Sequence, residues 1–211
     1  MKIRKLKINL MEIVDQNIIN TIKASGIGVL PTDTIYGLVG LALHKKAVEK
    51  IYKLKKRSPQ KPFIILIAEI EDLKKFGVAL DKPAKNILDK FWPGPVSVIL
   101  PCPMLKRELS YLWPLNKTLA FRCPKDKWLN NLLKETGPLV APSANIEGLP
   151  PAQTIKQAKK YFNDKVDFYF DEGTIKSAPS VLISLENRKI KVLRQGKTKI
   201  KALFNSCDRT N

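Results

Sequence analysis

Short apolar runs and amphipathic segments alternate along this chain. Unbroken apolar runs are typical of buried strands, and apolar positions at i, i+3, i+4 and i+7 are typical of helices. The runs predict strands at residues 26–30, 63–68, 96–100, 119–122, 138–141, 166–170, 180–184 and 190–193. The helical spacing predicts helices at residues 17–25, 45–54, 70–76, 82–91, 127–135 and 154–162. Residues 1–10 alternate basic and apolar side chains, which predicts an opening strand.

The order of these elements favours an α/β (mixed α+β) fold. Helices and strands alternate irregularly, and the strands that follow residue 166 have no helix between them. This order is expected of a single open, twisted, mixed β-sheet flanked by helices rather than of a regular doubly wound sheet. The chain has 211 residues and no internal repeat or low-complexity linker, which suits one domain. We therefore predict a single domain over residues 1–200 and a polar tail over residues 201–211.

Membrane, secretion and metal signals are weak. No apolar stretch approaches the ~20 residues that a membrane span needs, and residues 1–10 lack the apolar core of a secretory signal. Cys102, Cys123 and Cys207 fit no zinc-binding spacing, and His44 is the single histidine. We expect a cytoplasmic protein with reduced thiols, no protein-ligated metal and no membrane association. His44 stands at a helix start, where a solvated or capping role is expected.

A formal net charge of +19 is the most conspicuous bulk property. Such a surface attracts phosphate-rich partners such as nucleotides, RNA or tRNA. However, lysine far outnumbers arginine and is spread from end to end, as an AT-rich coding sequence would also give. Specific phosphate recognition more often concentrates arginine. The charge therefore leaves both interpretations open.

Polar clusters stand at the ends of several predicted strands, each next to Pro or Gly. Residues 31–38 are predicted to form one such loop, and ligands of open α/β sheets bind at the carboxyl ends of strands. Five cations occupy these clusters without a carboxylate in the same loops: Lys55, Arg57, Lys61, Arg122 and Arg194. The neutral hydrogen-bonding groups include Thr32, Thr118, Ser143, Asn145 and Ser180. This set suits a polyanionic ligand together with a small carboxylate.

Hydrolytic chemistry and the common nucleotide folds are not indicated. The chain has no Gly-x-Ser-x-Gly elbow and no paired Cys and His. It also lacks the Gly-x-x-x-x-Gly-Lys-Ser/Thr and Gly-x-Gly-x-x-Gly loops that bind phosphates. A nucleotide, if bound, is held in another way.

Seven short motifs occur in the order typical of one family. They are Pro31-Thr-Asp-Thr-Ile-Tyr-Gly-Leu38, Lys55-Lys-Arg57 with Lys61-Pro62, Trp92-Pro-Gly-Pro95, Phe121-Arg-Cys-Pro124, Ala141-Pro-Ser-Ala-Asn145, Pro179-Ser180 and Leu193-Arg-Gln-Gly196. Together they resemble the YrdC-like family of threonylcarbamoyl-AMP synthases in its short, TsaC-like form. Three positions depart from the family pattern. Ser97 replaces the usual threonine, Glu172 a usual glycine, and Pro179-Ser180 the commoner Glu/Pro-Ser-Thr.

The resemblance implies a YrdC-like catalytic domain with a large positive groove. The implied reaction converts L-threonine, bicarbonate and ATP to threonylcarbamoyl-AMP and pyrophosphate, for the threonylcarbamoyladenosine modification of tRNA. The implied nucleotide-binding residues are Lys55, Arg57, Lys61, Thr118, Ser143, Asn145 and Arg194, of which Lys55, Arg57, Ser143 and Asn145 are the implied catalytic residues. Thr32, Arg122 and Ser180 are implied to hold threonine. Mg2+ would arrive with ATP, and a threonylcarbamoyl transferase complex would use the product.

Two alternatives to synthase activity stay open at this point. The first is the YciO-like branch of the family, which tends to lack the full Lys-x-Arg and Ser-x-Asn set; this chain has all four residues. The second is an RNA-binding module that uses the positive groove as a track without chemistry. A steep salt dependence of RNA binding without ATP-to-pyrophosphate activity would favour that module.

Overall fold

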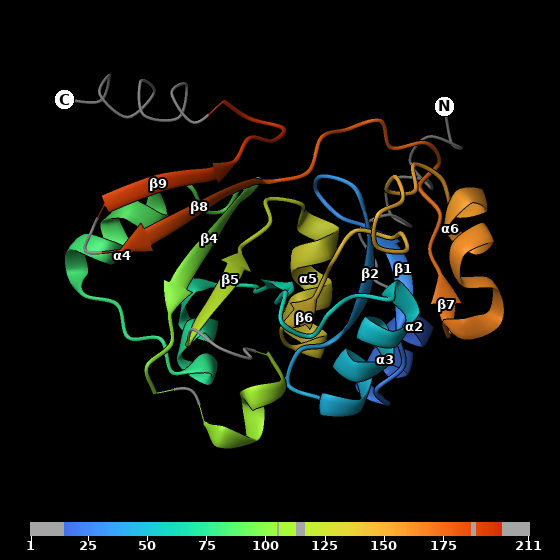
Figure 1. The fold of residues 1–211 in the computed structure, drawn as a ribbon, viewed down its shortest axis with the longest axis horizontal. Coiled ribbons are helices and arrows are strands. Elements are labelled where there is room, and N and C mark those ends of the chain that lie inside the picture. The colour runs from blue at the N-terminus through green and yellow to red at the C-terminus, as the bar shows by residue number, and fades with distance from the viewer. Residues whose placement is uncertain (1–14, 105, 113–116, 187–188, 200–211) are drawn as a thin grey trace, which may run out of the picture.

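A mixed β-sheet organises the described part of the chain. The computed structural model describes residues 15–104, 106–112, 117–186 and 189–199. Within them, nine strands form one sheet, and Figure 1 shows it fanning across the molecule. The strands, in order across the sheet, are β7 (Phe168–Tyr169), β1 (Gly28–Pro31), β2 (Tyr36–Leu41), β6 (Leu139–Val140), β3 (Ile64–Leu66), β5 (Thr118–Arg122), β4 (Val96–Pro101), β8 (Val181–Glu186) and β9 (Lys189–Arg194). The sheet is mixed, because β1–β7, β3–β5 and β4–β8 pair in parallel and the other neighbours pair antiparallel.

Helices cover both faces of this sheet. They are α2 (Gln16–Lys23), α3 (Lys45–Lys55), α4 (Lys82–Asp89), α5 (Lys127–Thr136) and α6 (Ile155–Phe162), with short 3-10 helices η1 (Ile70–Phe76), η2 (Arg107–Leu112) and η3 (Asn163–Lys165). Neighbouring strand residues point to opposite faces. Leu66 accordingly packs in the core cluster that includes α2 and α5, whereas Ile65 packs in the cluster that includes α3 and α6. The predicted fold, an open mixed sheet flanked by helices, is confirmed.

The predicted loop at residues 31–38 is the one clear error in the order of elements. Only the turn between β1 and β2 is a loop, because β2 begins at Tyr36 and pairs antiparallel with β1. Two glycines concealed this strand in the sequence. Gly40 is required by close packing: a Cβ there would lie 2.9 Å from Ile27 Cγ2 and 3.2 Å from Ile51 Cδ1 of α3. The hairpin turns the 32–35 segment back over the sheet.

Smaller differences concern the ends and types of elements. Segment 70–76 is a 3-10 helix, and the strand predicted at 63–68 is shorter, since β3 covers Ile64–Leu66. Thr154 accepts a hydrogen bond from the Gln157 amide and caps α6, so the helix predicted from residue 154 begins one residue later. The predicted strand at 1–10 and tail at 201–211 lie outside the described residues. Within the described ranges, no helix combines the length and apolar character that a membrane span requires.

The described cysteines and the histidine take no part in a reactive cluster. Cys102 and Cys123 are buried free thiols, and burial raises the pKa of Cys102 to about 12 and that of Cys123 to about 11. Both therefore stay protonated and unreactive near neutral pH. His44 is the N-cap residue of α3, and its carbonyl accepts from the Val48 amide, but its side chain makes no capping hydrogen bond. In the described segments no three His, Cys, Asp or Glu side chains gather to hold a metal ion.

Candidate active site

One cavity of about 520 Å³ collects most of the predicted site residues. Its wall comes from the β1–β2 turn, the segment between α3 and β3, strands β4, β5, β8 and β9, and the loop between β6 and α6. Eight of the ten predicted residues line it: Thr32, Arg57, Lys61, Thr118, Arg122, Ser143, Ser180 and Arg194. Lys55 and Asn145 are not part of the lining. Residues that are far apart in sequence thus meet in one place, as the strand-end clusters predicted.

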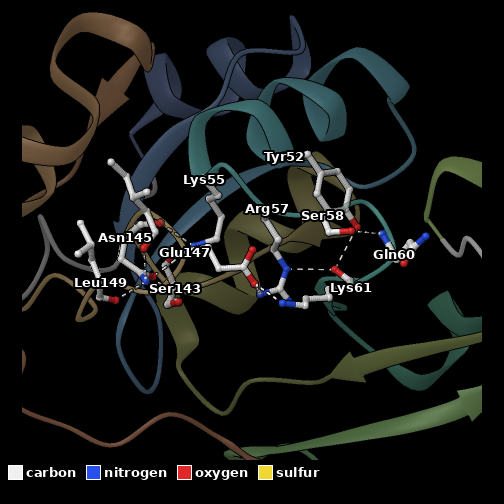
Figure 2. A network of polar contacts seen from close by, with 11 residues as sticks. Tyr52, Lys55, Arg57, Ser58, Gln60, Lys61, Ser143, Asn145, Glu147 and Leu149 are labelled. Carbon is white, nitrogen blue, oxygen red and sulfur yellow. Dashed lines mark hydrogen bonds and ion pairs between the residues drawn. The ribbon is translucent and has the colours of Figure 1, made fainter.

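Lys55 lies behind the wall of the cavity and holds the β6–α6 loop. It is the last residue of α3, and only 2% of it is exposed. Its Nζ donates to Ser143 O at 2.5 Å, to Asn145 O at 2.8 Å and to Asn145 Oδ1 at 3.2 Å. The Glu147 amide in turn donates to Lys55 O at 2.8 Å. Figure 2 shows this ammonium directed into the loop, where its three protons have three acceptors.

Burial changes the ionisation of this lysine. The pKa of Lys55 is lowered from 10.5 to about 7; burial is the largest cause, the nearby Arg57 charge adds to the lowering, and Glu147 opposes it. Desolvation disfavours the ammonium because a charge loses water on burial.

The loop itself is also fixed from within, since Ser143 Oγ donates to Asn145 Oδ1 at 2.6 Å and Asn145 Nδ2 donates to Leu149 O at 2.6 Å.

Arg57 and Lys61 face the cavity and share a carboxylate. Lys61 Nζ lies 2.9 Å from Glu147 Oε1, and Arg57 Nη1 lies 3.6 Å from the same oxygen. Arg57 is held by two further contacts: its Nε donates to Lys61 O at 3.1 Å, and its guanidinium carbon lies 5.6 Å from the centre of the Phe63 ring. The loops that carry these cations contain no carboxylate, as the sequence indicated, but the fold supplies one from a loop about ninety positions later in the chain.

Arg122 is also paired with a carboxylate, that of Asp33. Arg122 is only 3% exposed, and its Nη2 lies 2.9 Å from Asp33 Oδ1. Burial raises the pKa of Asp33 and lowers that of Arg122, and each charge opposes the shift of the other. Arg122 Nε has no hydrogen-bond partner among the described residues.

Ser180 joins Arg194 to a second buried hydroxyl. Arg194 Nη2 donates to Ser180 O at 3.0 Å and to Ser180 Oγ at 3.3 Å. The Oγ atoms of Ser180 and Ser97 lie 2.8 Å apart. Burial and the charges of Arg122 and Arg57 lower the pKa of Arg194. Three guanidinium groups are thus close enough to influence one another around this cavity.

The two predicted threonines differ in how much of their hydrogen bonding is used. Thr32 Oγ1 donates to Ile35 O at 2.7 Å and lies 3.2 Å from Thr34 Oγ1. It therefore stabilises the β1–β2 turn as well as lining the cavity. Thr118 is half-buried at the start of β5 and lines the cavity.

Sequence reasoning missed four residues of this region. Asp33 and Glu147 neutralise cavity cations, Ser97 contacts Ser180, and Lys197 Nζ donates to Asp33 O at 2.9 Å. Asp33 and Ser97 stood inside or next to recognised motifs. Glu147 and Lys197 carried no local signal, because their partners are distant in sequence.

Comparison with known proteins identifies the family. The family described as "Telomere recombination", which groups Sua5, YciO and YrdC, matches residues 20–196. The chain belongs to this family. Among curated relatives, a putative threonylcarbamoyl-AMP synthase of Methanocaldococcus jannaschii is 35% identical over 174 residues, which cover 82% of this chain and 80% of that protein.

Solved structures of Sua5 and YciO share the fold. Pyrococcus abyssi Sua5 complexed with L-threonine has a TM-score of 0.78 at 28% identity, and the match covers 89% of this chain. It covers 55% of the Sua5 chain, so this chain spans about half of that protein's length. Escherichia coli YciO has the same TM-score at 22% identity, with 92% of this chain and 93% of that chain covered. At that identity the likeness to YciO shows the fold alone.

Proposed function

We propose that this protein synthesises threonylcarbamoyl-AMP from L-threonine, bicarbonate and ATP, with release of pyrophosphate. The observation that carries the proposal is the cavity, which gathers Arg57, Lys61, Arg122 and Arg194 with several hydroxyl groups. Its described lining contains no histidine or cysteine that could act as a nucleophile. The names of the relatives, threonylcarbamoyl-AMP synthases, point to the same reaction.

The reaction needs positioning and charge stabilisation more than reactive side chains. Bicarbonate supplies CO2 with loss of water, the amine of threonine attacks this CO2 and loses a proton to give a carbamate, and an oxygen of the carbamate attacks the α-phosphorus of ATP. Pyrophosphate leaves, so the step is a nucleotidyl transfer. Both nucleophiles come from substrates, and the enzyme must align them and stabilise the charge that develops on the phosphate oxygens.

Arg57, Lys61 and Arg194 are the proposed contacts to the phosphates. All three line the cavity, and guanidinium groups form paired hydrogen bonds with phosphate oxygens. Thr118 and Ser143 would add hydrogen bonds from the same wall. Lys55 and Asn145 would act by holding this wall, because Lys55 Nζ is already bonded to three oxygens of the 143–145 segment. Lys55 is thus proposed as a positioning residue.

Arg122, Thr32 and Ser180 are the proposed contacts to threonine. Arg122 pairs with Asp33 through Nη2, and its Nε has no partner among the described residues. A substrate carboxylate would accept from the Arg122 guanidinium and from the Ser180 hydroxyl, since both residues line the cavity. Thr32 lines the cavity from the β1–β2 turn, which also carries Asp33, the partner of Arg122.

The proposed partners follow from this chemistry. Mg2+ would enter as part of the ATP substrate, coordinated by phosphates and water. The mixed anhydride product is reactive, so a threonylcarbamoyl transferase would accept it for tRNA modification. Because ATP and threonine are cytoplasmic metabolites, the cytoplasm is the proposed location.

Pyrophosphate release tests the proposal. The purified protein is incubated with Mg-ATP, with and without L-threonine and bicarbonate. Release that depends on both co-substrates is expected, and release that is indifferent to them refutes the proposal. Arg57→Gln should reduce turnover about 100-fold or more, as expected for loss of a group that stabilises transition-state charge. Lys53→Gln, an equal loss of charge on an exposed position of α3, should leave turnover unchanged.

A further inference from the structure

Glu147 brings a negative charge to the cations of the proposed phosphate site. Its Oε1 contacts Lys61 Nζ at 2.9 Å and Arg57 Nη1 at 3.6 Å, and Figure 2 shows the carboxylate directed at both groups. Arg57 and Lys61 line the cavity, whereas Glu147 does not. The carboxylate therefore approaches these cations from outside the space that a ligand would fill.

Structural stability does not account for this carboxylate. The side chains of Arg57 and Glu147 are 27% and 28% exposed, and that of Lys61 is 60% exposed. Ion pairs in such water-exposed settings contribute little to folding. Arg57 is also fixed without Glu147, by the Lys61 carbonyl and the Phe63 ring. The loop that carries Glu147 is tied to α3 by the backbone hydrogen bond to Lys55 O.

The negative charge of Glu147 opposes the binding of anionic ligands. A carboxylate near the two cations repels any anion that binds to them, and the repulsion grows with the charge of that anion. Pyrophosphate carries more charge than the single phosphate of AMP, and zwitterionic threonine carries no net charge. The residue therefore distinguishes among ligands by their charge.

We propose that Glu147 is a specificity-determining residue that weakens the binding of the pyrophosphate moiety of ATP and of the pyrophosphate product. The inference rests on the proposed function, which places a phosphate chain in this cavity. With Glu147 present, the cations stabilise the phosphates during the reaction while the highly charged product still dissociates. Without it, pyrophosphate would bind more tightly and compete more strongly with ATP.

The test compares Glu147→Gln with a matched control by calorimetric titration. The control is Glu135→Gln, which removes an equal charge from the exposed pair with Lys23, outside the cavity lining. Pyrophosphate without Mg2+, AMP and L-threonine are the probes, because Mg2+ would neutralise much of the pyrophosphate charge that the test depends on. Titrations are run at pH 8, above the pKa of about 7 of Lys55, so that Lys55 is mostly neutral in the wild type and also in Glu147→Gln, where loss of the carboxylate lowers this pKa further. Low and high salt are compared, because salt screens exposed charges.

Glu147→Gln should lower the dissociation constant of pyrophosphate about three- to tenfold, as expected when one charge a few ångströms from a polyanion is removed. The effect should be smaller for AMP, absent for threonine and reduced in high salt, and Glu135→Gln should match the wild type. Unchanged or weaker pyrophosphate binding in Glu147→Gln, or an equal gain in Glu135→Gln, overturns the inference. Binding is measured without turnover, so an inactive wild type that shows the expected pattern would refute the proposed reaction alone.

Discussion

Replacing Lys55 by methionine separates the positioning of the loop from the stability of the fold. Methionine retains most of the buried side-chain volume but has no proton to donate. Three acceptors then lose the Lys55 ammonium: Ser143 O, Asn145 O and Asn145 Oδ1. Asn145 Oδ1 keeps the Ser143 hydroxyl as a donor at 2.6 Å. The substitution therefore leaves two backbone carbonyl groups without this partner.

Two opposing contributions set the expected change in stability. Ser143 O keeps the Asn145 amide as a donor at 3.0 Å, so among these acceptors only Asn145 O is left without a donor, at a cost of about 1–3 kcal/mol. Removing the ammonium, however, relieves its desolvation. Burial lowers the pKa of Lys55 from 10.5 to about 7, a difference that corresponds to a cost on the order of 5 kcal/mol. The relief of desolvation is the larger contribution, and near pH 7 the free energy of unfolding should stay unchanged or rise by a few kcal/mol, on the order of 2–4 kcal/mol.

Turnover should fall although the fold is not destabilised. Ser143 lines the cavity, and Lys55 fixes its carbonyl. A displacement of about 1 Å in a positioning group can cost about 100-fold in rate. We therefore expect Lys55→Met to reduce pyrophosphate release about 100-fold while the protein stays folded.

Urea unfolding, pyrophosphate release and amide hydrogen exchange over residues 143–149 measure these effects. Lys53→Met, on the exposed side of α3, is the matched control. Exchange at the loop amides should be faster in Lys55→Met alone. Unchanged turnover and exchange would refute the positioning role, and a loss of stability well above about 4 kcal/mol would show that desolvation does not offset the lost hydrogen bonds.

Two further predictions concern the pH dependence of stability and the Ser97 hydroxyl that contacts Ser180. The pKa of Lys55 is lowered to about 7 in the folded protein from 10.5, so the unfolded chain binds more protons between these values. Stability should therefore rise with pH above 7 and fall as pH drops toward 7. The unfolding free energy of the wild type minus that of Lys55→Met, measured from pH 6.5 to 9, should increase by up to about 1.4 kcal/mol per pH unit. A difference that does not change with pH would contradict the shift. Ser97→Ala removes the hydroxyl 2.8 Å from Ser180 Oγ and should raise the KM for threonine about tenfold, equivalent to one lost hydrogen bond. Ser97→Thr keeps the hydroxyl and should retain the wild-type KM, so equal KM values in the two variants would exclude a role for this contact.

The sequence predicted the sheet well because each central strand is a buried apolar run. The runs at 96–100 and 119–122 differ from β4 and β5 by only one residue each. Strand β2 was missed because its glycines resemble a loop, and its need for them comes from the packing of α3. Close packing between elements leaves no local pattern that could indicate a strand.

The sequence predicted the cations of the candidate site but not the carboxylates that pair with them. Residue types and strand ends located Arg57, Lys61 and Arg122 at one cavity. Their carboxylates, Glu147 and Asp33, belong to other loops that only the folded chain brings close. A pattern along the sequence indicates which groups stand at strand ends, whereas pairing depends on which loops become neighbours.

Lys55 and Arg57 show how local backbone geometry assigns different roles to adjacent cations. Lys56 between them caps α3 with φ 50° and ψ 38°, a left-handed conformation that ends the helix. Lys55 keeps the direction of the last helical turn and is buried against the 143–145 segment. Arg57, beyond the cap, reaches the cavity and the Phe63 ring. The spacing that resembles a pair of phosphate ligands therefore supplies one buried anchor and one cavity cation, because the chain reverses at the residue between them.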